Sequence, residues 1–295
     1  MNYIVYQAYG SIDILNEVIY SIASVFKQSE SISFQIIIYT DNKEYLTTYL
    51  PSNIVFECIT TQTISSWRGN IDFVHRVKIM MLKDICKKYK GNILYLDTDT
   101  IFISPPDPVF QAIDKGQLVM HLNEGLISNT KNPLFRKIFR QIKSKTYLIE
   151  GKEIKISSNQ EMWNAGVIGF PSQKAHFLDA VLELTDCLYR QYPKHVMEQL
   201  AFSYVFITQR EIVPSDKFIF HYWNFKEFRS VLAQYVSVED TFEKILANYN
   251  LILPYQLNKP KVKFEKKPKI IRQILKHVLK KTWQPINYLQ LKGNL

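Results

Sequence analysis

The sequence predicts an α/β fold, in which helices flank an open and mostly parallel sheet, followed by a basic helical tail. Apolar segments at 3–8, 34–39 and 54–59 have the length of strands, and segment 12–26 has apolar residues at a helical period. The segment 34–39 is almost wholly apolar, which is typical of a parallel strand buried on both faces. This β-α-β-α-β order predicts a sheet that binds its ligands at the carboxyl ends of the strands.

Strand-length apolar segments and segments with a helical apolar period continue to alternate along the chain to about residue 206. A predicted helix at 73–89 leads directly into an apolar strand at 93–96, and this strand ends at Asp97-Thr98-Asp99. The other expected elements are strands at 118–121 and 167–170 and helices at 177–192 and 195–206.

The net charge of +10 lies at the C-terminal end of the chain. Residues 259–295 contain 11 Lys or Arg and one acid, Glu265, so residues 1–258 are close to neutral. A nucleic-acid-binding domain is expected to carry positive charge on its folded body, so nucleic acid is not an expected partner. The change in composition divides the chain into a predicted folded domain at 1–258 and a basic tail at 259–295.

The basic tail begins with a Lys- and Pro-rich segment, 259–269, which is typical of a linker, and continues with a predicted helix over 270–283. Apolar residues form one stripe of this helix, Lys and Arg lie elsewhere, and Trp283 stands at its end. The pattern fits an amphipathic helix that lies on an anionic membrane surface. A charge-solvated end of the chain is the alternative. The stripe consists of Ile270, Ile271, Ile274, Leu275, Val278 and Leu279.

The three cysteines, Cys58, Cys86 and Cys187, are odd in number and irregularly spaced, which indicates neither a zinc site nor a disulfide framework. Such cysteine usage fits a reducing compartment. The sequence does not open with a secretory signal, and no apolar run approaches the roughly 20 residues that span a bilayer. We therefore expect a cytoplasmic protein that is peripheral to the membrane.

Asp97 and Asp99 carry most of the chemistry that the sequence predicts. Side chains two residues apart in an extended backbone point to the same side, so both carboxylates are expected at the ligand-binding edge of the sheet. Divalent cations commonly bind to one or two carboxylates together with phosphate oxygens. A cation at this position would neutralise charge on a departing diphosphate. The alternative is a pair of turn-forming Asp residues.

Four segments, in this order, resemble motifs of the GT-A nucleotide-diphospho-sugar transferases, and among these the glycogenin- and galactosyltransferase-like family 8. The segment ILYLDTDTIF, at 93–102, resembles the Asp-x-Asp region of these enzymes. The segment WNAGVIGF, at 163–170, resembles their Asn-Ser-Gly-Val motif. Glu198-Gln199 resembles their Asp-Gln pair, and His221 falls where the family has a histidine as third metal ligand.

The resemblance extends over roughly residues 1–235 and has two departures from the family pattern. The family's Asp-Gln pair has Glu198 in place of Asp, and its Gly-x-x-Lys-Pro-Trp sequence is replaced by the segment 223–226, Trp-Asn-Phe-Lys. Lys226 is the candidate in this segment for a cation that contacts the diphosphate. Retention of configuration at the transferred sugar is the expected outcome, with inversion as the alternative.

The resemblance implies a metal site made of Asp97, Asp99 and His221. Two carboxylates and a neutral imidazole suit Mn²⁺ better than Mg²⁺, although either cation is compatible with the motif. The alternative for His221 is a buried histidine without a ligand, because its sequence neighbours Phe220 and Tyr222 are both aromatic.

The resemblance also implies three residues with catalytic roles, Asn164, Glu198 and Gln199. Asn164 offers a donor and an acceptor to sugar hydroxyls. Gln199 is neutral, so it would stabilise an oxocarbenium-like centre and would not act as a strong base. Base catalysis, where it is needed, would fall to Glu198 or Glu161.

Donor binding is expected from residues at the strand ends and on the helix that precedes the Asp-x-Asp strand. In similar proteins basic residues on this helix approach the diphosphate, Arg in a bidentate manner and Lys as a point charge, and a solvated helix face is the alternative. Asp41 follows the second strand and has a turn-forming role as its alternative. Gly166 would let the backbone approach a ligand closely. The expected donor-binding residues are Ala8, Tyr9, Asp41, Arg76, Lys78, Asp97, Asp99, Gly166 and Lys226.

The sequence therefore predicts a metal-dependent glycosyltransferase. It would transfer a hexose from a UDP-sugar to a glycan or lipid-linked acceptor in cell-surface polysaccharide or lipopolysaccharide assembly. A nucleotidyltransferase on a similar sheet is one alternative, but it would be expected to have a Gly-rich phosphate loop near the N-terminus. Gly10 is the single glycine in residues 1–30, which argues against this alternative. The other alternative is a catalytically inactive scaffold associated with a membrane.

Overall fold

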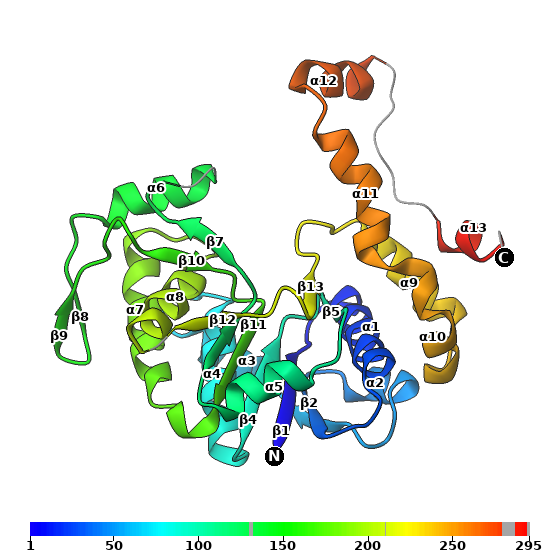
Figure 1. Ribbon diagram of the computed structural model, residues 1–295, viewed down its shortest axis with the longest axis horizontal. Coiled ribbons are helices and arrows are strands. Elements are labelled where there is room, and N and C mark those ends of the chain that lie inside the picture. Colours follow the sequence, from blue (N-terminus) through cyan, green and yellow to red (C-terminus); the bar gives the residue numbers. More distant parts are fainter. Residues whose placement is uncertain (130–131, 210, 279–286, 294–295) are drawn as a thin grey trace.

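The computed structural model describes residues 1–129, 132–209, 211–278 and 287–293. Within these residues, seven strands form one main sheet in the order β12-β6-β11-β4-β1-β2-β3, with helices on both faces (Figure 1). The predicted mostly parallel α/β fold is thus confirmed.

The N-terminal half of the sheet consists of parallel strands. β1 (Asn2–Gln7) pairs with β2 (Phe34–Thr40) on one side and with β4 (Asn92–Leu96) on the other, and β3 (Val55–Cys58) pairs with β2. The helices α1 (Ile12–Gln28), α2 (Lys43–Tyr49) and α4 (Arg76–Lys88) connect or precede these strands, as predicted.

The other half of the sheet contains an antiparallel strand, which the sequence pattern did not indicate. β11 (Val167–Pro171) lies antiparallel to both β4 and β6 (Leu118–Met120), and β12 (Ile212–Pro214) is parallel to β6. Because β11 pairs with β4, the residues just before β11 lie beside the residues just after β4. This antiparallel pairing brings the Asn-Ala-Gly segment next to the Asp-x-Asp segment.

Each face of the sheet covers its own hydrophobic core. Val5 and Tyr95 belong to the core that contains α4, α7 (Phe177–Gln191) and α8 (Met197–Gln209). Their neighbours along the same strands, such as Tyr6 and Leu94, belong to the core around α1. Side chains alternate between the faces of a strand, so strands that are apolar at every position fill both cores.

Shorter elements complete the fold around the carboxyl ends of the strands. β13 pairs with β5 so that His221 lies opposite Thr100, directly after the Asp-x-Asp segment. The further elements are α3 (Thr61–Arg68), β5 (Thr100–Phe102), α5 (Asp107–Asp114), β7 (Asn123–Leu126), α6 (Pro133–Ile142), β8 (Tyr147–Ile149), β9 (Lys152–Ile154), β10 (Glu161–Trp163), β13 (Ile219–His221), α9 (Phe228–Val238) and α10 (Phe242–Asn248).

The prediction of a linker at 259–269 is wrong for most of this segment, because the helix α11 (Pro254–Glu265) includes its first seven residues. The same helix runs across residue 258, where the predicted folded domain ends. Pro254 occupies the first turn, where a missing N–H costs nothing, and Lys is a good helix former, so the Lys content is compatible with a helix, which continues past the internal Pro260. The α11 helix is also attached to the body, because the Lys261 Nζ donates to the carbonyl of Asn224.

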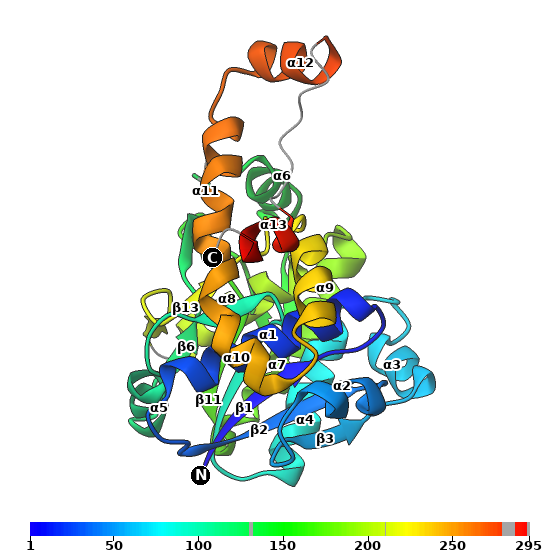
Figure 2. The same ribbon diagram turned by 90° about the vertical axis from the view of Figure 1, so that its right-hand side faces the viewer.

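The C-terminal helices differ in how they lie relative to the sheet. The helices α11 and α12 (Lys269–His277) extend away from the sheet, whereas α13 (Tyr288–Lys292) packs near α9 (Figures 1 and 2). Tyr288 is fully buried there and donates to Glu239 Oε1 at 2.7 Å. The end of the predicted helix, including Leu279 and Trp283, lies outside the described residues.

The part of the chain that the structure describes contains no helix with both the length and the apolar character needed to cross a bilayer. The thiols of Cys58, Cys86 and Cys187 are all free.

Candidate functional site

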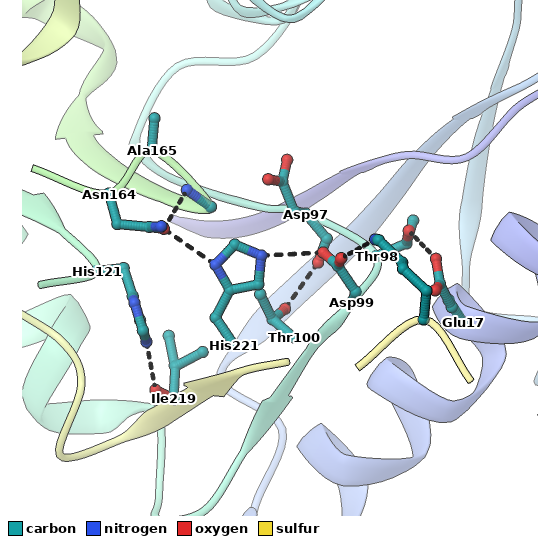
Figure 3. Close-up of polar contacts among 12 residues, drawn as sticks. Glu17, Asp97, Thr98, Asp99, Thr100, His121, Asn164, Ala165, Ile219 and His221 are labelled. Atoms are coloured by element: carbon teal, nitrogen blue, oxygen red, sulfur yellow. Dashed lines mark hydrogen bonds and ion pairs between the residues drawn. The ribbon is translucent and has the colours of Figure 1, made fainter. Parts of the chain in front are cut away.

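Asp97 and Asp99 lie at the carboxyl end of β4, at the edge of the sheet predicted to bind ligands (Figure 3). The backbone N–H of Asp97 donates to the carbonyl of Gly166 at 2.8 Å, and Tyr95 donates its hydroxyl to Asp97 Oδ1 at 2.5 Å. One ligand atom each from Asp97, Asp99 and His221 lies within 4.8 Å of the other two. The structure therefore brings together the three residues expected to hold a metal ion.

The imidazole of His221 is oriented by hydrogen bonds at both ring nitrogens. Nδ1 lies 2.9 Å from Asn164 Oδ1, and Nε2 lies 3.0 Å from Asp99 Oδ1. Asn164 Oδ1 also accepts from the N–H of Gly166 at 3.0 Å, so this amide oxygen is an acceptor and His221 Nδ1 is the donor. A proton on Nε2 makes the contact with Asp99 a hydrogen bond, and loss of that proton leaves a lone pair on Nε2 that faces Asp99, as metal coordination requires.

Gly166 has no side chain because the ring of His221 occupies the adjacent space. A Cβ built on Gly166 would lie 2.3 Å from His221 Cε1, which is far inside van der Waals contact. The sequence suggested that this glycine admits a ligand. The structure shows a second reason for glycine at this position, because a side chain here would overlap the imidazole of His221.

Two lysines lie beside the carboxylates. Lys78 is buried, with its Nζ 3.1 Å from Asp97 Oδ1 and 3.0 Å from the carbonyl of Ala165. Lys226 Nζ lies 2.7 Å from Asp99 Oδ2. Burial alone raises the pKa of Asp99, but His221 and Lys226 outweigh it and hold the pKa of this carboxyl well below its usual range. Asp99 is therefore an ionised ligand at neutral pH.

The residues present fit a divalent cation. Asp97 and Asp99 offer hard oxygen donors, and the oriented Nε2 of His221 adds a borderline nitrogen donor, a combination that suits Mn²⁺. The side chain of Lys226 is 55% exposed, so it can move away from Asp99 without unfolding its surroundings. The carboxylates, the imidazole and the diphosphate of a nucleotide could then share one ion.

The carboxylates separate two cavities. The larger one has a volume of about 580 Å³ and the smaller one about 250 Å³, and His75, Lys78, Asp97 and Asp99 line both. Tyr9 lines the smaller cavity together with Gln7, Ile14, Glu17 and Arg229. Residues from β7, α8 and β13 line the larger cavity, so a ligand with two parts could extend across the carboxylate pair.

The predicted catalytic residues lie in the larger cavity. Asn164, Glu198 and Gln199 line it, and all three side chains are buried. Gln199 Nε2 donates to Glu124 Oε2 at 2.7 Å, and Asn164 Nδ2 donates to Glu124 Oε1 at 3.3 Å. Glu198 Oε2 is buried without a hydrogen-bond partner among the described residues, which leaves this oxygen available to a ligand hydroxyl.

Three expected donor-binding residues do not line either cavity. Arg76 donates Nε to Asp186 at 2.9 Å and Nη1 to the carbonyl of Trp67 at 2.8 Å, so its guanidinium links helices instead of facing a phosphate. Ala8 is fully buried and its N–H donates to the carbonyl of Tyr39. Asp41 accepts from the N–H of Gly10 and borders a separate cavity.

Glu161, the second residue considered as a base, is also occupied elsewhere. Its Oε2 accepts from Trp163 Nε1 at 2.8 Å, and it does not line the larger cavity. Glu198 remains as the carboxylate of the motif that faces this cavity, together with Glu124, which the sequence reasoning missed. Glu124 lies in the four-residue strand β7, whose composition gives no sign of a site.

Glu17 is a second residue that sequence reasoning missed. It is buried on α1, where it accepts from Thr98 Oγ1 at 3.0 Å (Figure 3). It also accepts from Arg229 Nε at 2.7 Å. Burial raises the pKa of Glu17, and the hydrogen bond from Arg229 opposes that rise. Because Thr98 stands between the two aspartates, this bond fixes the Asp-x-Asp segment. In the predicted helix 12–26 Glu17 falls outside the apolar stripe, so the sequence pattern carried no signal for its role.

A scan against protein-family models gave no match for this chain, and a search of curated protein sequences gave none either. Among solved structures, the chain is similar to the galactosyltransferase LgtC in complex with donor and acceptor sugar analogs, with 15% identity and a TM-score of 0.47 over 69% of this chain and 70% of that one. An active-site mutant of LgtC gives 16% identity and a TM-score of 0.47 over the same shares. Mouse xyloside xylosyltransferase 1, in its apo form, gives 10% identity and a TM-score of 0.49 over 72% of this chain and 84% of that one. All three structures are of glycosyltransferases.

Proposed function

We propose that this protein is a metal-dependent glycosyltransferase that moves a hexose from a UDP-sugar to a glycan or glycolipid acceptor. The observation that supports this function best is the convergence of Asp97, Asp99 and His221 within 4.8 Å. Asp97 and Asp99 line two cavities, which suits a donor whose nucleoside and sugar are joined through a diphosphate. The smaller cavity would take the nucleoside and the larger one the sugar.

The diphosphate is the leaving group of this reaction, and its negative charge must be stabilised as the bond to the sugar breaks. A divalent cation, held by Asp97, Asp99 and His221, would supply Lewis-acid stabilisation of that charge. Lys78 and Lys226 add two positive charges beside the carboxylates, where they can contact phosphate oxygens. The buried position of Lys78 strengthens its electrostatic effect, because little water screens it.

The larger cavity would orient the transferred sugar. Glu124 fixes the amides of Asn164 and Gln199, so their remaining polar atoms can contact sugar hydroxyls in a constant geometry. The neutral Gln199 amide can stabilise an oxocarbenium-like centre without forming a stable bond to it. We propose retention of configuration, as the motif resemblance implies.

The tail supports a second part of the proposal, in which the protein attaches to the anionic cytoplasmic surface of a membrane. In α12 the side chains of Ile270, Ile271 and Ile274 are exposed, and this helix stands clear of the body (Figure 2). Exposed Lys side chains on α11 lie close by in the sequence. An apolar face beside basic residues is the pattern of a helix that lies in the membrane interface. Such attachment would suit an acceptor in cell-surface polysaccharide or lipopolysaccharide assembly.

Donor hydrolysis tests the proposed activity without knowledge of the acceptor. We expect the protein to release UDP from at least one of UDP-glucose, UDP-galactose, UDP-xylose and UDP-N-acetylglucosamine when Mn²⁺ is present. The rate should fall at least about 100-fold with a chelator or in Asp99→Asn, because leaving-group stabilisation is lost. Asp240→Asn, which changes an exposed carboxylate that pairs with Lys244, is the matched control and should keep the parent rate. Release of UDP at equal rates in the parent and in Asp99→Asn would contradict the proposal.

A further inference from the structure

The larger cavity has a buried inner end and an exposed outer end. Asn164, Glu198 and Gln199 form the inner end and are all buried. His195 and Trp223 line the same cavity but are exposed to solvent. If the transferred sugar occupies the inner end, next to the carboxylates, the group that receives it has to approach through the outer end.

Trp223 differs from the two other tryptophans in the described part of the chain. Trp163 is buried and donates its indole N–H to Glu161, and the ring of Trp67 packs against Tyr39 with the ring centres 6.1 Å apart. Trp223 is 51% exposed, and within the described residues no hydrogen bond or ring contact of its side chain is found. Ligand-binding cavities are lined mainly by apolar and aromatic side chains, so an indole in the wall of this cavity is placed to contact a ligand.

The backbone that carries Trp223 is nevertheless held firmly. The N–H of Tyr222 donates to the carbonyl of Asp99 at 3.0 Å, and the N–H of Phe225 donates to the carbonyl of Tyr222 at 2.8 Å. The side chains of Tyr222 and Phe225 are both buried. The indole is therefore presented from a fixed turn that is tied directly to the Asp-x-Asp segment.

A pyranose ring has one face composed mainly of C–H groups, which packs well on a large aromatic ring. Indole offers the largest such surface among the side chains and loses little conformational entropy when it binds. Leu134, at the start of α6, lines the same cavity and adds a second apolar surface to it. His195, another exposed residue that lines this cavity, can serve the hydroxyl groups at the edge of the ring.

We propose that Trp223 is the acceptor platform, and that the acceptor is a carbohydrate whose terminal pyranose packs on this indole. The inference rests on the proposed glycosyltransferase function and adds to it the residue that binds the acceptor sugar and the way in which it is recognised. The indole binds the acceptor sugar and directs one of its hydroxyls towards the inner end of the cavity. A hydroxyl of a protein side chain lacks the flat apolar face and gains nothing from this contact.

The test compares transfer to lactose, maltose and cellobiose, with the donor that the parent protein hydrolyses. We expect the parent to accept at least one of these disaccharides and Trp223→Ala to raise its KM at least about tenfold. Trp223→Phe keeps an aromatic face and should stay within about threefold of the parent KM. Leu148→Ala, which removes another exposed apolar side chain at a distance in the sequence, is the control and should leave the KM unchanged. In each variant the Kd of UDP with Mn²⁺ should stay within about twofold of the parent, which excludes unfolding.

The outcomes separate this inference from the proposed function. A parent protein that hydrolyses no donor sugar contradicts the proposed function. A parent that hydrolyses a donor but transfers to none of the disaccharides overturns the carbohydrate acceptor, and transfer to a serine-containing peptide under the same conditions would identify a protein acceptor instead. An unchanged disaccharide KM in Trp223→Ala, in an active protein, overturns the platform role of Trp223.

Discussion

At the scale of single residues, His121 is buried beside the ring of His221, with the ring centres 5.4 Å apart. Its Nε2 donates to the carbonyl of Ile219 at 3.0 Å, and its Nδ1 is buried without a partner in the described chain. Burial, and then the nearby charge of His221, lower the pKa of His121 to about 4. The folded protein therefore keeps His121 neutral in a pH range where the unfolded chain binds a proton.

The free energy of unfolding should depend on this histidine at mildly acidic pH. Between its ordinary pKa of about 6.5 and its folded pKa of about 4, the unfolded state binds more protons, so stability is present above pH 6.5 and is lost as the pH falls. From about pH 7 to about pH 5 we expect the parent to lose about 2 kcal/mol more than His121→Gln, which keeps a donor for Ile219 but does not titrate. Urea unfolding with a chelator present measures this difference. Parallel pH profiles of the two proteins would refute the role of His121.

The sequence predicted some site residues and missed others for a physical reason. Asp97 and Asp99 could be predicted because their relation is local: both follow one strand and point to one side. Glu17 could not be connected with Thr98 and Arg229, because these contacts join positions that are far apart in the chain. Glu124 acts through hydrogen bonds to two amides, and a single acid in a short strand has no pattern that signals such partners.

At the scale of elements, regular apolar periodicity predicted the helices and strands reliably, whereas the composition of a segment did not. The strands β1, β2 and β4 and the helix α1 were predicted within a few residues, because burial on both faces leaves a continuous or periodic apolar pattern. The segment at 259–269 was mistaken for a linker because of its Lys and Pro content. Between β7 and β10 the strands have only three or four residues, too few for a period to be visible.

The α12 helix makes a prediction that belongs to this scale. Its exposed Ile270 and Ile274 should insert into the interface of an anionic membrane, so Ile270→Ser/Ile274→Ser should reduce flotation with phosphatidylglycerol-containing vesicles at least about tenfold. Leu148→Ser changes an equally exposed apolar residue on β8 and should float like the parent. Point substitutions are preferable to removal of the tail, because Tyr288 near its end is buried in the body. Equal flotation of the double variant and the parent would remove the membrane role.

At the scale of the whole molecule, the site depends on how the sheet is assembled. The antiparallel strand β11 sets Gly166 beside Asp97, and the pairing of β13 with β5 sets His221 opposite Thr100. Neither pairing could be deduced from the sequence, because strand order and direction depend on contacts between distant segments. The two cavities that meet at the carboxylates are likewise a product of the assembled fold.

The central claim is that Asp97, Asp99 and His221 hold a cation that binds the diphosphate of a nucleotide. Titration calorimetry of UDP into the protein, with Mn²⁺ and then with a chelator, tests this claim most directly. We expect binding with Mn²⁺, and at least about 100-fold weaker binding with the chelator or in Asp97→Asn/Asp99→Asn, because the charges of the diphosphate then lack their cation. UDP that bound equally well without Mn²⁺, or equally well to the double variant, would contradict the account.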